Sequence, residues 1–271
     1  MKRYITLVFK SIDTLYNSFI TKNYVPVKYF NDTPNWGDEL NHYLVEKITK
    51  KKVVRVTIGV TDHLLAIGSV LRGARRGSVV WGSGFIDKNH IPRGNPQRFC
   101  SCRGPLTWNK LNELGFECPQ VYGDPGLLIS KYYEPKIEKK YKLGFVPHYT
   151  EKNMEIVNFL KGKGVKIVDI QLSIEDFVDE LLQCENIISS SLHGLVASDS
   201  YNIPNRWVKI SDRLLGGDFK FNDYHLGVGV KHSCHILEKS DSVERLIELC
   251  ESKKIIFDAD TLLAAFPHDK F

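Results

Sequence analysis

Hydrophobic residues follow two alternating periodicities along most of this chain. Short apolar runs, typical of buried strands, are followed by stretches in which apolar side chains recur every three or four positions, as on one face of a helix. Such alternation predicts βαβ units and hence parallel sheets covered by helices. In the first half the predicted strands are residues 25–30, 53–57, 64–68, 78–81, 99–102 and 120–122, and the predicted helices are 38–49 and 105–114.

A lysine-rich stretch without apolar periodicity, residues 131–141, interrupts this pattern. The alternation then resumes, with strands predicted at 142–146, 165–170, 186–189 and 205–210 and helices at 154–160, 174–182, 192–200, 243–250 and 259–266. We therefore predict an α/β fold of two doubly wound Rossmann-like domains. The N-terminal domain would be residues 1–130, the linker 131–141 and the C-terminal domain 142–271, with the last helices able to pack back on the N-terminal domain.

The first twenty residues have an amphipathic pattern of their own. Apolar residues recur at helical spacing from Ile5 to Ile20, and Lys10 and Asp13 lie on the opposite face. Two interpretations remain open, a helix packed on its own domain or a helix on a membrane surface. Because no apolar run reaches the roughly 18 residues of a membrane span, we expect a cytoplasmic protein. Contact with the inner face of the membrane is the second option.

Charge and cysteine content limit the kinds of ligand and partner that the sequence predicts. A net charge of +5 suits an anionic substrate or membrane face but is too weak to indicate nucleic acid. Six cysteines include one C-x-C pair, Cys100 and Cys102, with no second pair at metal-site spacing. We expect reduced thiols, no metal and no nucleic-acid partner, and the oligomeric state stays open.

Polar segments in the first half follow predicted strands, where ligands of doubly wound sheets bind. The candidate residues there are Asn35, Trp36, Gly37, Asp38, Ser83, Gly84, Arg103 and Asp124. Each has a simpler explanation as well. Asn35 could only cap a helix, Arg103 could pair with a neighbouring aspartate, and Asp124 could belong to an Asp-Pro turn.

The second half holds the most informative segment, three serines that end a strand and precede His193 in the first turn of a helix. Hydroxyls and free amides at a helix N-terminus form an anion-binding cradle, and a histidine there can donate protons near neutral pH. The cradle would comprise Ser190, Ser191, Leu192, His193 and Gly194. His148 follows another predicted strand, and residues 216–224 form a polar, aromatic loop without an obvious helix.

Taken together, these segments resemble the polysaccharide pyruvyl transferase family, in its exopolysaccharide or succinoglycan-type branch. The resemblance covers residues 25–230, and its segments are Asn-x-Gly-Asp, Arg-Gly-Pro-Leu-Thr, Gly-Asp-Pro-x-Leu, Pro-His-Tyr, Ser-Ser-Leu-His-Gly followed by Ile-Pro, and Gly-Gly-Asp-Phe-Lys-Phe-x-Asp-Tyr. It implies a two-domain fold similar to GT-B glycosyltransferases. It also implies a pyruvate ketal made from phosphoenolpyruvate as co-substrate, with no metal or other cofactor.

One position departs from the family. Many members carry Arg-Leu-His where this chain has Ser191 before the Leu-His pair, so another cation must bind the donor. Arg103, Lys220 and Arg213 are the candidates, in that order. We expect the donor phosphate at the serine turn and Lys220, and the carboxylate at Arg103.

The expected chemistry begins when His193, or as second choice His148, protonates the methylene carbon of the donor. Asp38 or Asp124 would then orient a sugar hydroxyl or accept its proton. Asn35, Trp36, Gly37, Ser83 and Gly84 would face the acceptor, a sugar or lipid-linked oligosaccharide. Two other functions remain open, a GT-B-type glycosyltransferase that uses a nucleotide sugar and a non-catalytic sugar-binding module.

Overall fold

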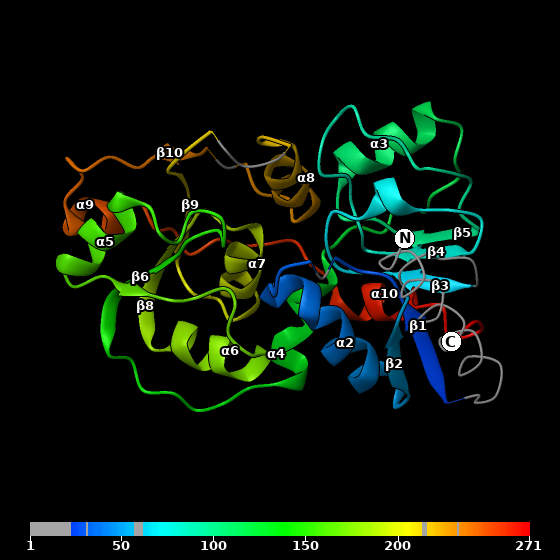
Figure 1. The fold of residues 1–271 in the computed structure, drawn as a ribbon, viewed down its shortest axis with the longest axis horizontal. Helices are drawn as coiled ribbons and strands as arrows, with labels where there is room; N and C mark the ends of the chain where they lie inside the picture. The colour runs from blue at the N-terminus through cyan, green and yellow to red at the C-terminus, as the bar shows by residue number, and fades with distance from the viewer. Residues whose placement is uncertain (1–22, 31, 57–61, 213–215, 232) are drawn as a thin grey trace, which may run out of the picture.

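The computed structural model describes residues 23–30, 32–56, 62–212, 216–231 and 233–271. Two parallel five-stranded sheets form separate halves of the molecule (Figure 1). The predicted amphipathic segment at the N-terminus and the candidate Arg213 lie outside the described residues. In the described ranges, no helix combines the length and apolarity needed to span a bilayer.

The N-terminal sheet has the strand order β2-β1-β3-β4-β5, and every pairing in it is parallel. Its strands are β1 (Tyr24–Val27), β2 (Lys52–Arg55), β3 (His63–Leu65), β4 (Ser78–Trp81) and β5 (Arg98–Ser101). Their apolar side chains are buried on both faces, as expected for a parallel sheet covered by other elements. Tyr122, in the last predicted strand of this domain, makes only a single bridge to Cys102.

Helices and short turns lie between these strands or follow the last of them, β5. They are α2 (Trp36–Thr49), the 3-10 turn η1 (Leu71–Gly73), α3 (Pro105–Glu113), the 3-10 turn η2 (Pro125–Leu128) and α4 (Ile129–Tyr132). Asn35 caps α2, because its Oδ1 accepts the Gly37 amide at 3.1 Å. Pro105 occupies the first turn of α3, where a missing N–H costs nothing.

The C-terminal sheet has the order β10-β9-β8-β6-β7 and is also parallel. Its strands are β6 (Tyr141–Val146), β7 (Lys166–Ile167), β8 (Cys184–Ser189), β9 (Asn205–Lys209) and β10 (His235–Ile236). Its helices are α5 (Glu155–Gly162), α6 (Ile174–Leu182), α7 (Leu192–Ser200), α8 (Phe219–Gly227) and α9 (Val243–Glu248). The two parallel α/β domains predicted from the alternation are therefore present.

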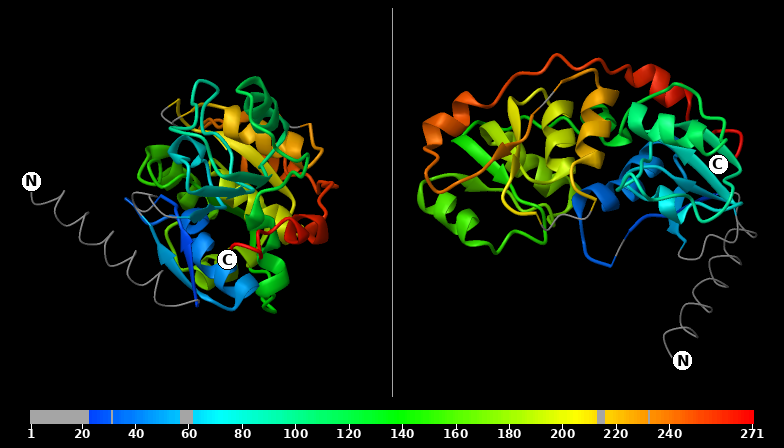
Figure 2. Two further views of the ribbon diagram at one scale, coloured as in Figure 1. Left: turned by 90° about the vertical axis from the view of Figure 1, so that its right-hand side faces the viewer. Right: turned by 90° about the horizontal axis from the view of Figure 1, so that it is seen from above.

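The end of the chain returns to the first domain. From α9 it runs back across the molecule to α10 (Ala259–Ala264), which lies beside the N-terminal sheet (Figures 1 and 2). The Trp81 indole donates to the Leu262 carbonyl at 2.8 Å, and the Phe266 ring packs edge-on against it at 5.0 Å. The last segment thus covers apolar surface of the N-terminal domain.

One predicted element is wrong. Residues 216–224 are not an irregular loop, because α8 begins at Phe219. The helix has no side-chain cap, and its charged Lys220 and Asp223 are buried while apolar Leu226 is exposed, so it lacks the one-sided pattern that identifies a surface helix. It lies beside α3 of the other domain (Figure 1).

Candidate active site

Two ionisable side chains from opposite domains face each other where the domains meet. The Nε2 atom of His193, in the first turn of α7, lies 3.8 Å from Oδ2 of Asp124, which precedes η2. Neither atom has a hydrogen-bond partner in the described structure, although both are buried. Buried polar atoms are rarely left unpaired, so these two are the clearest sign of a position made for a ligand.

The His193 ring is held by close packing. A Cβ atom added at Gly37 would overlap the ring, so only glycine fits at this point of α2. Burial, followed by the positive charges of Lys220 and Arg103, lowers the pKa of His193 to about 3. The imidazole of His193 is therefore neutral at pH 7.

Burial has the opposite effect on the two acidic groups. Desolvation raises the pKa of Asp124 to about 6, although the Gly126 amide donates to its Oδ1 at 2.9 Å. Desolvation, helped by the negative charge of Glu39, raises the pKa of Asp38 to about 7. Near neutral pH these carboxyl groups are therefore able to hold or release a proton.

Lys220 is the cation of this cluster. It projects from α8, is 8% exposed, and makes no hydrogen bond or ion pair within the described ranges. Burial and the charge of Arg103 lower its pKa to about 8, and the negative charges of Asp38 and Glu151 oppose that shift. The ammonium lies 5.3 Å from the centroid of the Phe221 ring. A buried ammonium group without a counter-charge is costly, and an anionic ligand would supply that charge.

The beginning of α7 offers further donors. Ser191 caps the helix without a side-chain hydrogen bond to it, so the first amides have no intrahelical or capping partner. Ser189 shapes the turn, because its Oγ accepts the Ser191 amide at 3.0 Å and donates to the Val146 carbonyl. Gly194 lies tightly against Ser189 and Val146, where a side chain would not fit.

Ser190 has a different task from its neighbour. Its hydroxyl donates to the buried carboxylate of Glu151 at 2.7 Å and accepts the His148 amide at 3.0 Å. His148 itself bonds through Nδ1 to the Thr150 hydroxyl at 2.8 Å. Burial and the charge of Lys220 lower the pKa of His148 to about 3. Ser190 and Glu151 thus fix the loop that carries His148.

Arg103 does not face an open donor site. Its Nε and Nη2 atoms bind Asp223 at 3.0 and 2.9 Å, Nη1 donates to the Ser69 hydroxyl at 2.8 Å and Nη2 to the Phe85 carbonyl at 2.6 Å. The side chain is fully buried. The alternative of an ion pair with an aspartate is therefore the observed one, and the assignment of the donor carboxylate to Arg103 is revised.

Four other candidates, three predicted to face the acceptor and Leu192 predicted to face the donor, lie in the core instead. Trp36 is fully buried between the domains, where its indole donates to the Ile174 carbonyl at 3.1 Å. Ser83 donates to the Gly68 carbonyl at 2.8 Å, and Gly84 lies against the guanidinium of Arg103. Leu192 packs in an apolar cluster with Leu127. Apolar burial or a satisfied hydrogen bond leaves each without a group to offer a sugar.

Of the predicted residues, Gly37, Asp38, Asp124, His148, Ser191, His193, Gly194 and Lys220 meet at this site. Sequence reasoning missed Asp223 and Glu151. Asp223 belongs to the Gly-Gly-Asp-Phe-Lys-Phe-x-Asp-Tyr segment, which was the available signal. Glu151 follows the Pro-His-Tyr segment without a distinguishing pattern. In the described ranges no three His, Cys, Asp or Glu side chains are grouped to hold a metal ion.

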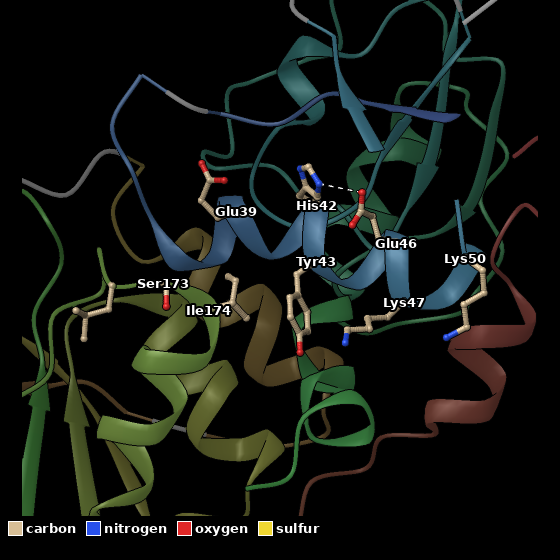
Figure 3. A pocket seen from close by; sticks show the side chains of 9 residues that line it. Glu39, His42, Tyr43, Glu46, Lys47, Lys50, Ser173 and Ile174 are labelled. Atoms are coloured by element: carbon tan, nitrogen blue, oxygen red, sulfur yellow. Dashed lines mark hydrogen bonds and ion pairs between the residues drawn. The ribbon is translucent and has the colours of Figure 1, made fainter. Parts of the chain in front are cut away.

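A separate groove of about 600 Å³ runs between α2 and α6. Glu39, next to Asp38, lines one end, and Tyr43 points from α2 toward the C-terminal domain (Figure 3). The Tyr43 hydroxyl already donates to Glu175 at 2.8 Å, and His42 pairs with Glu46 at 3.0 Å. The groove therefore lacks the unpaired buried groups that distinguish the His193 site.

Comparison with known proteins gives two relatives of similar length. The chain is 29% identical over 218 residues to an uncharacterized protein, L143, of Acanthamoeba polyphaga mimivirus. The match covers 76% of this chain and 75% of the relative. It is 27% identical over 227 residues to the succinoglycan biosynthesis protein ExoV of Rhizobium meliloti (strain 1021). This match covers 79% of this chain and 68% of ExoV. This second similarity supports the succinoglycan-type branch.

A solved structure gives a weaker likeness. The functionally uncharacterized protein KP1_0663 of Klebsiella pneumoniae subsp. pneumoniae NTUH-K2044 matches 79% of this chain and 91% of its own, with a TM-score of 0.44 and 14% identity. This likeness is too weak to support a conclusion about this chain. A family model, in contrast, matches residues 13–212, well over half of the chain. The chain therefore belongs to the polysaccharide pyruvyl transferase family.

Proposed function

We propose that this protein transfers a pyruvyl group from phosphoenolpyruvate to a sugar of a bacterial surface polysaccharide or its precursor, with formation of a ketal and release of phosphate. Family membership and the similarity to ExoV, a succinoglycan biosynthesis protein, support the reaction class. One structural observation carries the proposal to the residues. His193 Nε2 and Asp124 Oδ2, from two domains, are buried without a hydrogen bond, and the charge of Lys220, which has no counter-ion in the described ranges, acts on His193.

The donor is a small molecule with a phosphate and a carboxylate. The phosphate fits the free amides of α7 and the Ser191 hydroxyl, because helix N-termini bind anions. Lys220 supplies the nearest unpaired positive charge and takes the place proposed for the arginine that many members carry before Leu-His. Because Arg103 is paired with Asp223, the donor carboxylate would also bind to Lys220 and the α7 amides.

The proton transfer proposed for His193 requires a change of charge. The low pKa of His193 keeps the ring neutral at pH 7. A donor with several negative charges next to the ring favours imidazolium and raises that pKa. The proton then passes to the methylene carbon of phosphoenolpyruvate. His148 and Asp38 are the alternative acids, and Asp38 has the pKa closest to neutrality, about 7.

The remaining steps form two C–O bonds. Protonation of the methylene carbon makes the neighbouring carbon electrophilic, and a first sugar hydroxyl adds to it and loses its proton to Asp124 or Asp38. A second hydroxyl of the same sugar then attacks the same carbon, the C–O bond to the phosphate breaks, and the cyclic ketal closes. The phosphate leaves with the electron pair of that C–O bond and takes up the proton of the hydroxyl. The proposed reaction needs no cofactor; phosphoenolpyruvate is the co-substrate. We also propose that the two domains are arranged as in GT-B enzymes.

The test is incubation of the purified protein with phosphoenolpyruvate and a panel of lipid-linked or synthetic glycosides. Expected are release of phosphate and a product whose mass and NMR spectrum show a pyruvate ketal. His193→Ala should turn over roughly 10²–10⁴-fold more slowly while it folds normally. Consumption of a nucleotide sugar in place of phosphoenolpyruvate would indicate the glycosyltransferase. Sugar binding without any donor use would indicate a binding module.

A further inference from the structure

We infer that Asp223 is a positioning residue that places Lys220 in the donor site by holding α8 against the N-terminal domain through Arg103. This inference rests on the proposed function, since the task of Lys220 is to bind the anionic donor. Lys220 and Asp223 are three residues apart on one helix, a spacing that puts both side chains on the same face. Whatever holds Asp223 therefore also sets where Lys220 points.

The carboxylate of Asp223 is fully occupied by the other domain. It accepts hydrogen bonds from Arg103 Nε at 3.0 Å, from the Thr107 amide at 2.8 Å and from the Thr107 hydroxyl at 2.7 Å. Arg103 Nη2 lies 2.9 Å from the same carboxylate, and both side chains are 0% exposed. Every one of these donors belongs to the N-terminal domain.

The backbones of the two domains also meet at this point. A Cβ atom at Gly104 would overlap the Asp223 carbonyl, and one at Gly227 would overlap the Arg103 carbonyl. Glycine at both positions allows α3 and α8 to approach more closely than side chains would permit. The contact is therefore a fitted junction with little freedom to shift.

The neighbouring residue ties α8 to its own domain. The Tyr224 hydroxyl donates to Asp199 at 2.7 Å, and Asp199 pairs with Lys253 at 3.3 Å. α8 is thus anchored on one side to each domain, with Lys220 in between. The Lys220 ammonium lies 5.3 Å from the centroid of the Phe221 ring on the same helix, and no ion pair within the described ranges holds it, so its position depends on α8.

A role in stability alone explains this arrangement poorly. Buried ion pairs are often no more stabilising than apolar residues of similar size, because desolvation offsets the attraction. What an Asp–Arg–Thr junction does provide is a fixed geometry between the two domains. That geometry brings the unpaired ammonium of Lys220 near Asp38 from the N-terminal domain.

A double-mutant cycle on phosphoenolpyruvate binding, measured by calorimetry, tests the inference. Lys220→Ala should raise the dissociation constant roughly 10- to 100-fold, as expected for the loss of one charge-assisted contact. Asp223→Asn should raise it similarly, and the double variant should be no weaker than Lys220→Ala alone. Effects that multiply in the double variant would overturn the inference.

A second readout does not depend on the donor. Lys220 should react slowly with an amine-modifying reagent in the wild type, whereas Lys142, whose side chain is 75% exposed, reacts fast. In Asp223→Asn the modification rate of Lys220, followed by mass spectrometry, should rise toward that of Lys142. An unchanged rate would overturn the inference even if phosphoenolpyruvate proved not to be the donor. Failure of wild-type binding alone would count against the proposed function.

Two further variants guard against loss of folding. Thr107→Val removes one hydrogen bond to Asp223 and keeps the ion pair, so it should shift both readouts in the same direction by less. Ile156→Val, on α5 in a different apolar cluster, lowers stability without contact to α8 and should shift neither. A shift in Ile156→Val equal to that in Asp223→Asn would show that general destabilisation is the cause.

Discussion

At pH 7 His193 is neutral, and the pKa of Asp38, raised to about 7, lets this carboxyl group hold or release a proton. Desolvation is the largest cause of the pKa shift in both groups, as it is for Asp124 and Lys220. The site therefore carries less charge than its residue types suggest. An anionic donor raises the pKa of the groups beside it, so it favours the charged forms of His193 and Lys220 and the neutral forms of Asp38 and Asp124.

The raised pKa of Asp38 predicts a pH-dependent stability. The folded protein keeps the proton up to about pH 7, whereas the unfolded chain loses it near pH 4, so the folded state binds more protons in between. This contribution is complete below pH 4 and is lost as the pH rises to about 7. Asp38→Asn should therefore become more stable relative to wild type over this range, by a few kcal/mol (roughly 1.4 per pKa unit). Urea titrations from pH 4 to 8 measure the difference, and a constant difference would contradict the assignment.

Gly37 predicts a steric effect on His193. In Gly37→Ala the new methyl group must displace the imidazole ring, so we expect a turnover at least about tenfold lower and a free energy of unfolding lower by about 1–3 kcal/mol. Gly162→Ala is the matched control, because a Cβ there meets nothing within 4 Å. It should keep wild-type turnover, and alanine should stabilise the helix slightly. Equal turnover of both variants would mean that the ring position does not matter.

At the scale of elements, helix beginnings position most of the site. Asn35 caps α2 and so orders Gly37 and Asp38, and the start of α7 carries His193. The predicted helices 174–182 and 192–200 agree with α6 and α7, because capping residues and turns mark their ends locally. α8 escaped prediction because its burial comes from two domains at once.

The cap of α2 gives a test at this scale. Asn35→Ala should lower the free energy of unfolding by about 1 kcal/mol and should also lower turnover, because the first turn of α2 carries Asp38. Ser242→Ala removes the corresponding cap of α9, where Oγ accepts the Arg245 amide at 3.1 Å. It should lose similar stability without loss of turnover. If the two variants had the same turnover, the start of α2 would have no role in catalysis.

At the scale of the whole molecule, the chain crosses between its halves more than once. The linker predicted at 131–141 leads into the second domain, and residues after α9 return to place α10 on the first (Figure 2). Trp36 packs at 4.9 Å from Phe177, and Arg103 binds Asp223, so the two halves share buried contacts on either side of the site. These contacts between the halves hold His193 and Asp124 facing each other.

Phe266 tests the returning segment. Its side chain is 4% exposed and packs on Trp81, so Phe266→Ala should lower the free energy of unfolding by about 3–5 kcal/mol. The folded fraction of this variant should bind phosphoenolpyruvate as the wild type does, because the groups proposed to bind the donor lie elsewhere. Denaturant titration and calorimetry measure the two quantities. A loss below about 1 kcal/mol would show that α10 adds little to the first domain.

The sequence by itself determined the alternation of strands and helices, the two domains and the polar segments at strand ends. These depend on periodicity and on residues near one another in the chain, so they can be read locally. Only the tertiary structure decided which side chains meet. Arg103 binds Asp223 across 120 positions of sequence, and that contact, rather than residue type, removed Arg103 from the open site and left Lys220 in it. Burial set the pKa values for the same reason, since desolvation depends on everything packed around a group.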